Sequence, residues 1–496
     1  MTSYYDIHVE NELTKKNTFK MKPLKVTTVP SIEHFIKNTP RIAWSNNEET
    51  ISCYNYAWKQ AYSSLKPAND YFYKPFIDTC FNDHLFMWDS VFMMHFGKYA
   101  ASAFPFFGTL DNLYQTQHSD GFICREIHEE TGLERFERFD YSSTGPNLFA
   151  WIEWDRYQLT GDLERLKKVY PVITSYHQWL RNYRTWKDGT YFTSGWGSGM
   201  DNLPRQSAEY SPEFHHGFLS WIDMTAQQAL SCDCLIKIAK EIDVKIPTDM
   251  EDEYHLLSVK IQEMWDEDTG FFYDKNRFGQ LTKIMTIGSF WVMLSGLASV
   301  KQAKRMVEHL MNPSDFYTTM VIPGLASHHP LCDDNYWRGG VWAPTNYMVF
   351  KALERYGYYS EKHQLAKRYL QGIVQDYSEF QKLYEVYESK TGKHQSIARP
   401  DFVGWTGLAP ITILIEDIFG IKLNYLHHEL YIHIQEQNAY SIDQLHIGND
   451  CLHIAYQPEN EQAFIRVTSN ELWNVTVYDR THAQHSFHSS IRTKDE

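Results

Sequence analysis

The sequence is short of the features that would place the protein in a membrane or an oxidising compartment. Only seven cysteines occur in 496 residues, an odd and scattered set typical of reduced core thiols. No window of 18 or more apolar residues predicts a transmembrane helix. The segment Met1–Ile7 has neither a basic nor an apolar signal-peptide region. We therefore expect a cytoplasmic protein without a membrane partner.

Positive charge is also scarce, and so are metal-binding patterns. The chain carries 47 Lys and Arg against 62 Asp and Glu, a net charge of −15. This balance argues against nucleic acid and anionic lipid as partners, because both require clustered basic residues. Cys232 and Cys234 lack the two-residue gap of a zinc pair, and no histidine pair has a helical metal motif around it. We expect no metal and no cofactor.

Apolar and aromatic side chains are abundant, at 43% and 16% of the chain. This apolar content suffices for a large core and excludes disorder as the main state. The length predicts two or three domains, or one large toroidal domain with an appendage. We expect an N-terminal arm over residues 1–50, a helical zone over 51–420 and a β-domain over 421–496.

Helical periodicity dominates the middle zone. Apolar residues recur there at three- and four-residue spacings, for example over residues 219–238. Glycines followed by Asp or Ser predict helix ends and the caps of the next helices. The joints of this kind are Gly161–Asp162, Gly296–Ser299 and Gly357–Ser360. At about 30 residues per helix–loop unit the zone would hold on the order of twelve helices, which fits an α/α toroid.

The period changes to two after Ile421. Apolar and polar residues alternate over Leu430–Ile434, Leu452–Ile454 and Trp473–Val477, with turn residues between these runs. The chain is therefore predicted to be mainly α-helical, with a small antiparallel β-domain at the end.

Four loops combine carboxylates or guanidinium groups with Trp and Gly. They are Asp83–Phe92, Gly195–Arg205, Tyr336–Trp342, and the pair Tyr384–Glu388 and Phe402–Gly407. A sugar presents an apolar face that stacks on aromatic rings and a hydroxyl rim that needs polar partners. These loops therefore predict a carbohydrate site, to which Trp196, Arg205 and Tyr384 are assigned as substrate-binding candidates.

Hydrolysis of a glycosidic bond requires two carboxyl groups, one protonated and one ionised. Asp201 and Glu385 are the candidate pair. Apolar neighbours such as Trp196 would raise the pKa of Asp201 and suit it to act as an acid. An Asx-turn is an equal alternative for Asp201, Glu388 is a rival to Glu385, and Asp89 reads first as a helix cap.

The order and spacing of these loops resemble glycoside hydrolase family 63, in the wider group of trehalases and mannosylglycerate hydrolases. The resemblance covers roughly residues 70–420, and its most specific piece is Gly199-Met200-Asp201-Asn202 followed by Pro204-Arg205. It implies an (α/α)6 barrel that hydrolyses an α-linked sugar with inversion. Asp201 would be the general acid and Glu385 the base. Trp88 and Asp89 would hold the sugar, and the remaining wall would comprise Arg125, Asn202, Trp337, Arg338, Trp342 and Trp405.

Two departures from the family leave alternatives open. Glu388 occupies a neutral position after the expected base, and the β-domain is longer than in the smallest relatives. Our leading hypothesis is an inverting α-glycosidase, most simply an α-glucosidase, acting on a small oligosaccharide or sugar conjugate. A sugar 2-epimerase using the paired histidines 215–216, 328–329 or 427–428 is the alternative, and a non-catalytic sugar-binding protein is the third. A homo-oligomer stays open.

Overall fold

The structure is a computed structural model that describes residues 9–22, 28–79, 82–459, 462–479 and 483–491. The expectations for Met1–Ile7 and Cys80 lie outside the described residues. Cys53, Cys124, Cys232, Cys234 and Cys332 are buried free thiols. Within these ranges, no helix combines the length and the apolarity needed to cross a bilayer.

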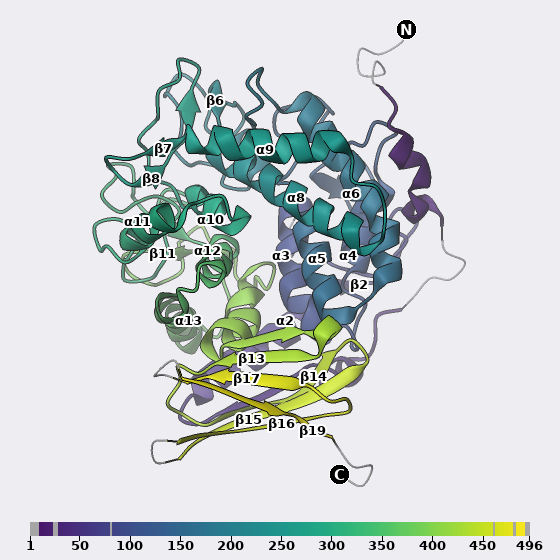
Figure 1. Cartoon of the computed structure of the whole chain (residues 1–496), viewed down its shortest axis with the longest axis vertical. Helices are drawn as coiled ribbons and strands as arrows, with labels where there is room; N and C mark the ends of the chain where they lie inside the picture. Colours follow the sequence, from purple (N-terminus) through teal and green to yellow (C-terminus); the bar gives the residue numbers. More distant parts are fainter. Residues whose placement is uncertain (1–8, 23–27, 80–81, 460–461, 480–482, 492–496) are drawn as a thin grey trace.

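Six inner helices of the described chain form a ring at the centre of the molecule (Figure 1). In chain order they are α3 (Met87–Gly97), α5 (Phe149–Thr160), α8 (Ile222–Glu241), α10 (Trp291–Ser295), α12 (Ala343–Arg355) and the π-helix η7 (Ala409–Ile418). Each contacts the next, and α3 contacts η7. The ring is therefore the inner layer of an α/α toroid.

Six outer helices alternate with the inner ones along the chain. They are α2 (Glu48–Ser63), α4 (Gly108–Gln115), α6 (Leu163–Tyr183), α9 (Thr248–Gln262), α11 (Val300–Leu310) and α13 (Tyr359–Phe380). Their sequences differ from those of the inner layer because only one face is buried. All residues of α3 are buried, whereas α11 buries only the stripe that includes Ala303, Met306 and Leu310.

Two of the three predicted helix joints have the predicted caps. Gly161 ends α5 in a left-handed conformation, and the Asp162 side chain accepts a hydrogen bond from the Arg165 amide. Ser299 and Gln302 form a capping box at the start of α11. At the third joint the cap prediction is wrong, because α13 begins at Tyr359 and takes Ser360 into its first turn.

The C-terminal strands form two sheets beneath the helices (Figure 1). Their strands are β12 (Ile421–Asn424), β13 (Glu429–His433), β14 (Tyr440–Ile447), β15 (Asp450–Glu459), β16 (Gln462–Ser469), β17 (Asn474–Tyr478), β18 (Gln484–His488) and β19 (Ser490–Ile491). Most pairings are antiparallel, as predicted. The pairs β13–β17 and β16–β19 are parallel, since the chain passes through the other sheet between the two partners.

The N-terminal arm contributes to the same β-region. Strand β1 (Arg41–Trp44) pairs antiparallel with β14, with Ile42 opposite Ile442. Thus a segment expected to wrap the toroid supplies an edge strand to the C-terminal sheet. The arm also contains α1 (Ile32–Lys37), η2 (Glu12–Lys16) and η3 (Thr18–Lys20).

Short strand pairs hold the loops that precede the inner helices. Strand β4 (His84–Phe86) pairs with β5 (Glu126–His128) immediately before α3. Strand β10 (Gly340–Val341) pairs with β11 (Tyr387–Glu388) before α12. The remaining short elements are β2 (Leu65–Lys66), β3 (Phe76–Ile77), η4 (Lys98–Ala100), α7 (Gly195–Ser198), β6 (Leu219–Ser220), β7 (Trp265–Asp266), β8 (Phe271–Phe272), β9 (Lys275–Asn276), η5 (Ile287–Phe290), η6 (Thr406–Leu408) and η8 (Tyr425–His427).

Candidate active site

A cavity of about 530 Å³ lies among the loops that lead into the inner helices. Its wall combines tryptophans with carboxylates and guanidinium groups, as the loop sequences predict. The lining residues are Asn82, His84, Phe86, Trp88, Asp89, Arg125, Glu126, Arg135, Trp196, Gly199, Asp201, Tyr336, Trp337, Arg399 and Trp405. Seven predicted site residues are among them: Trp88, Asp89, Arg125, Trp196, Asp201, Trp337 and Trp405. The volume is in the range of small-molecule sites.

Asp201 follows the short helix α7, and the glycines before it allow a tight turn. A Cβ on Gly195 would lie 2.0 Å from the Asp201 carbonyl oxygen, and one on Gly199 would lie 2.7 Å from the Trp88 ring. The glycines therefore permit close packing inside the protein. Of Gly195 and Gly199, only Gly199 lines the cavity, so both serve internal packing and one of them also lies next to the site.

The environment of Asp201 favours its protonated form. Burial raises the pKa of the carboxyl to about 7, attraction to Arg125 lowers it, and the charge of Glu385 raises it further. The predicted alternative, an Asx-turn, would need the carboxylate to accept a backbone hydrogen bond. The structure shows no such bond to Asp201 from a described residue.

Glu385 is 3% exposed and is held by three residues that line the cavity. Its carboxylate accepts a hydrogen bond from the Tyr336 hydroxyl at 3.0 Å and lies 3.7 Å from Arg399 Nε. Its backbone oxygen accepts the Trp405 indole N–H at 2.9 Å. Burial raises the pKa of Glu385, whereas Tyr336 and Arg399 lower it by favouring the ionised form.

The rival carboxylate, Glu388, lies elsewhere. It is half-buried in β11, and its Oε2 accepts a hydrogen bond of 2.6 Å from Thr391. Neither glutamate is among the lining residues, but the charge of Glu385 acts on Asp201, whereas Glu388 is not among the groups that shift the pKa of Asp201. The geometry therefore distinguishes two glutamates that are three residues apart in the sequence.

Trp88 and Asp89 lie in the first turn of α3, so Asp89 is not the helix cap; that position is Phe86. Both side chains are buried, and Trp88 Nε1 and Asp89 Oδ1 have no hydrogen-bond partner among the described residues. Burial raises the pKa of Asp89 well above its ordinary value, although Arg125 opposes the shift. Unpaired buried polar atoms are costly, so a cavity wall that carries them is suited to a polar ligand.

Arg125 and Trp196 form one side of the cavity. The guanidinium lies 5.4 Å from the centre of the Trp196 ring and 4.9 Å from that of Phe136. It also forms an ion pair of 3.2 Å with Glu126. Its Nε atom is buried and has no partner among the described residues. Arg125 is thereby fixed in place with a donor still free.

The opposite side is a stack of tryptophans. Trp337 and Trp342 are parallel, with ring centres 4.1 Å apart and planes 3° apart. Trp342 in turn packs edge-on against Trp405 at 5.6 Å. Trp337 and Trp405 line the cavity, whereas Trp342 is fully buried behind them. Trp342 therefore supports the wall and does not form it.

Like Trp342, three further predicted ligand residues do not line the cavity. Arg205 is 2% exposed and forms ion pairs with Asp223 at 2.6 Å and Asp274 at 2.7 Å. Arg338 pairs with Asp333, and Tyr384 stacks on His394 with ring centres 3.6 Å apart. Each of these three contacts another protein side chain and Trp342 stacks on Trp337, so the cavity lining gives no support to their predicted contact with substrate, which stays a prediction.

Asn202 has a positioning role in the structure. Its Oδ1 accepts the Trp337 amide at 2.8 Å, and its Nδ2 donates to the Asn335 carbonyl at 3.1 Å. The side chain thereby fastens the loop that carries Trp337 to the loop that carries Asp201. It is not part of the cavity lining.

The sequence analysis missed several lining residues. Tyr336 directly precedes Trp337, and Glu126 follows Arg125, so both lie within segments that the sequence singles out. Arg135 and Arg399 carry no such signal. The backbone amide of Glu385 donates a hydrogen bond of 3.1 Å to the Arg399 carbonyl, and this contact brings Arg399 to the site. The pairing forms only in the folded chain.

The histidine pairs lie away from the cavity. His328 forms an ion pair with Asp315 at 3.0 Å, and His428 pairs with Glu471 beside the β-region. Burial lowers the pKa of His216 to about 4 and also lowers that of His215. None of the six lines the cavity.

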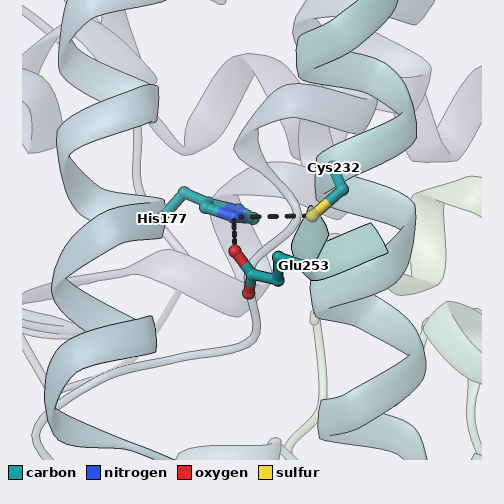
Figure 2. A group of neighbouring side chains, drawn as sticks. All are labelled: His177, Cys232 and Glu253. Carbon is teal, nitrogen blue, oxygen red and sulfur yellow. Dashed lines mark hydrogen bonds and ion pairs between the residues drawn. The ribbon is translucent and has the colours of Figure 1, made fainter. Parts of the chain in front are cut away.

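One group of described side chains has the composition of a metal site. Figure 2 shows His177 from α6, Cys232 from α8 and Glu253 from α9, all buried. His177 Nε2 lies 3.0 Å from Glu253 and 3.6 Å from the Cys232 sulfur. Gln228 also donates to this histidine and glutamate, and burial raises the pKa of the Cys232 thiol well above its ordinary value. The group is satisfied by hydrogen bonds and lies outside the cavity.

Comparison with solved structures supports the fold. The mannosylglycerate hydrolase of Thermus thermophilus, a glycoside hydrolase family 63 protein solved with glucose, superposes with a TM-score of 0.60. The match covers 72% of this chain and 98% of that one at 18% identity. The predicted (α/α)6 toroid is thereby confirmed.

Sequence relatives agree with this placement. An uncharacterised protein of Borreliella burgdorferi is 24% identical over 396 residues, which cover 77% of this chain and 80% of that protein. The cytosolic neutral trehalase of Kluyveromyces lactis is 34% identical over 112 residues, 22% of this chain and only 15% of the trehalase.

A family model decides the assignment. The model of the mannosylglycerate hydrolase MGH1-like glycoside hydrolase domain matches residues 83–406, which include every loop of the cavity. The protein therefore belongs to this branch of glycoside hydrolase family 63 and is a glycosidase.

Proposed function

We propose that the protein is an inverting α-glycosidase in which Asp201 is the general acid and Glu385 the general base. The observation that carries the proposal is the contrast between Asp201, which lines the cavity, and Glu385, which contacts three residues of the cavity wall. Asp201 has a pKa of about 7 and no hydrogen-bond donor fixing its ionised form. Glu385 accepts a hydrogen bond from Tyr336 and faces Arg399. Such a separation of environments assigns acid and base roles in glycosidases.

The reaction follows from these roles. The Asp201 carboxyl gives its proton to the glycosidic oxygen as the bond between that oxygen and the anomeric carbon breaks. Glu385 takes a proton from a water molecule, whose oxygen attacks the anomeric carbon from the opposite face. The sugar thereby gains a hydroxyl at the anomeric carbon with inverted configuration. Asp201 has lost one proton and Glu385 has gained one.

Trp88, Asp89 and Arg125 are proposed to hold the sugar that is cleaved from its aglycone. Each has a buried polar atom without a partner among the described residues: Trp88 Nε1, Asp89 Oδ1 and Arg125 Nε. Sugar hydroxyls can satisfy donors and acceptors of this kind, and the faces of Trp196, Trp337 and Trp405 suit the C–H surface of a pyranose. The roles of these residues rest on this chemistry.

The epimerase alternative requires paired histidines at the cavity. The three pairs do not line the cavity, whereas Asp201 lines it and Glu385 contacts the lining residues Tyr336 and Arg399. We therefore favour hydrolysis.

For the substrate we propose a small α-glycoside, with an α-glucoside as the first candidate. The exposed guanidinium of Arg135 on the cavity wall favours an aglycone that carries a carboxylate, as in the relatives named for mannosylglycerate, over the neutral disaccharide trehalose. A cytoplasmic location remains a proposal, supported by the five buried free cysteines. The oligomeric state also remains open.

The first experiment identifies the substrate and the stereochemistry together. A panel of α-glucosides and α-mannosides, including trehalose and the α-glycosides of glycerate, is incubated with the protein. The anomer of the sugar that is released first is identified by NMR. We expect the β-anomer of the released sugar to appear first. For substrates other than trehalose, initial release of the α-anomer would refute the inverting scheme; for trehalose, whose leaving group is itself α-glucose, release of two α-glucoses and no β-glucose would refute it.

The second experiment assigns the carboxyl groups. We expect Asp201→Asn and Glu385→Gln to reduce kcat by about 10²–10⁴-fold, the usual contribution of a general acid or base. Glu388→Gln is the matched control and should keep kcat within about twofold. A large loss in the control with full activity in Glu385→Gln would reverse the assignment of the base.

A further inference from the structure

A second groove lies outside the catalytic cavity and shares none of its lining residues. It has a volume of about 410 Å³ and is formed where β6 pairs with β9 and the segment after α6 folds over them. Its lining residues are Trp186, Lys187, Asp188, Phe218, Ser220, Lys275, Asn276, Arg277 and Gly279. The mechanism above uses none of them.

Two aromatic rings form the apolar part of this groove. Trp186 and Phe218 are both half-buried, with ring centres 6.5 Å apart and planes only 26° apart. The Trp186 indole donates a hydrogen bond of 2.7 Å to the Leu219 carbonyl, which fixes the orientation of its ring. The groove thus has a rigid, nearly parallel aromatic pair.

Phe218 adopts a backbone conformation that phenylalanine rarely takes. Its φ is +54°, in the left-handed region that favours glycine. A strained non-glycine residue that lines a groove is typical of a position where the side chain is needed for binding. The ring also packs against His216 at 4.8 Å and Tyr210 at 5.6 Å, and it remains only partly buried at the groove.

Polar groups surround the aromatic pair. The exposed Arg277 guanidinium lies 5.1 Å from the centre of the Phe218 ring, and no described residue pairs with it by a hydrogen bond or an ion pair. Asp188 lies 3.6 Å from the Lys275 ammonium group. Partial burial raises the pKa of Asp188, but hydrogen bonds from Thr190 outweigh this effect and lower it. Donors and an ionised acceptor therefore lie next to the aromatic surface.

We propose that this groove is a second carbohydrate-binding site that takes a pyranose ring of an oligosaccharide. The ring would stack on Trp186 and Phe218, and its hydroxyls would bond to Asp188, Asn276 and Arg277. Aromatic faces with a polar rim match the amphipathic surface of a sugar. The site is separate from catalysis and does not depend on the assignment of Asp201 or Glu385.

The test is binding of maltoheptaose, a neutral α-glucan oligosaccharide, followed by hydrogen–deuterium exchange. We expect the ligand to protect the segments 186–188 and 275–279. Phe218→Gly should abolish this protection and weaken binding there about 10-fold, the loss of one aromatic contact. Glycine suits a φ of +54°, so this variant should retain the wild-type Tm within a few degrees.

Two further variants keep the test decisive. Arg277→Gln changes only an exposed side chain and should weaken the same protection several-fold without affecting folding. Phe464→Ala is the matched control, because Arg466 lies over the exposed Phe464 ring at 5.8 Å on a strand that does not line this groove; it should bind as the wild type does. Turnover of a small chromogenic α-glycoside should be unchanged in all three. Protection confined to the catalytic loops, or retained in Phe218→Gly and Arg277→Gln, would overturn the proposal.

Discussion

At the residue scale, the proposed mechanism rests on two carboxyl groups in unlike surroundings. Asp201 is half-buried and accepts no hydrogen bond from a described residue, and burial raises its pKa to about 7. Glu385 is 3% exposed, but Tyr336 and Arg399 favour its ionised form. Asp201 should therefore be protonated below about pH 7, and Glu385 should be ionised at a lower pH than burial alone would allow. The profile of kcat/KM against pH is expected to be bell-shaped.

Removing the Tyr336 hydroxyl should narrow that profile from the acidic side. In Tyr336→Phe the Glu385 carboxylate loses its 3.0 Å hydrogen bond. Its pKa therefore rises further, and a higher pH is needed to ionise it so that it can act as a base. We expect the acidic limb to move up by about one pH unit, the equivalent of one charge-assisted hydrogen bond. The basic limb, set by Asp201, should not move.

Tyr384→Phe is the control for this measurement. Tyr384 precedes Glu385 directly but stacks on His394 away from the cavity. Its profile should match the wild type. A shift of the basic limb in Tyr336→Phe would mean that the tyrosine acts on the acid instead.

At the scale of elements, a buried ion cluster holds the loop of Asp201 to the inner layer. Arg205 leaves this loop and joins Asp223, in the first turn of α8, to Asp274, with Trp221 beneath the guanidinium at 4.1 Å. The Gly-Met-Asp-Asn segment with its Pro-Arg end is thus conspicuous in the sequence for two reasons. Asp201 serves the site, whereas Arg205 anchors the segment.

Arg205→Met should therefore destabilise the protein without weakening substrate binding. Two buried carboxylates would lose their common partner, which costs about 3–5 kcal/mol. We expect that loss in urea unfolding, with KM of the folded fraction within about twofold of wild type. Arg338→Ala, which removes a partly exposed pair with Asp333, should cost at most about 1 kcal/mol. A large rise in KM for Arg205→Met at unchanged stability would restore the original prediction of a substrate ligand.

At the scale of the whole molecule, the toroid and the β-region are joined by aromatic packing and strand pairing. Trp44 of β1 packs edge-on against Phe419 at 5.4 Å, and Phe419 stacks on Tyr440 at 4.1 Å. The arm, the end of the last inner helix and β14 therefore share one contact. Lys422 of β12 adds an ion pair of 2.9 Å with Glu354 of α12.

Trp44→Ala should reveal whether these parts unfold together. The residue is 7% exposed, and truncation of a buried aromatic side chain costs about 3–5 kcal/mol. We expect a single unfolding transition, shifted down as a whole, when near- and far-ultraviolet circular dichroism are compared. Phe464→Ala, an exposed aromatic residue of the same β-region, should leave the midpoint in place. A separate early transition of the strands alone would show that the two parts are independent.

The class of fold and the loops that make the site can be read from the order of residues alone. Hydrophobic period is a local property, so the change from helical to alternating spacing near Ile421 is visible without coordinates. The clustering of Trp, Gly and carboxylates is visible in the same way. The local sequence leaves Asp201 equally open to an Asx-turn, and the family resemblance favours it as the acid. The charges that act most on its pKa, those of Arg125 and Glu385, come from distant segments of the chain.

Only the tertiary structure shows which residues of those loops contact one another. Glu385 and Glu388 have near-identical local sequence, and the approach of Tyr336 and Arg399 is what distinguishes them. Arg205, Arg338, Trp342 and Tyr384 look like ligands in the sequence, but in the structure each contacts another side chain. The contacts are with Asp223 and Asp274, with Asp333, with Trp337 and with His394, respectively. The same holds for β1, which pairs with a strand some 400 residues away. Side-chain direction and long-range pairing depend on contacts between remote segments, and no local pattern encodes them.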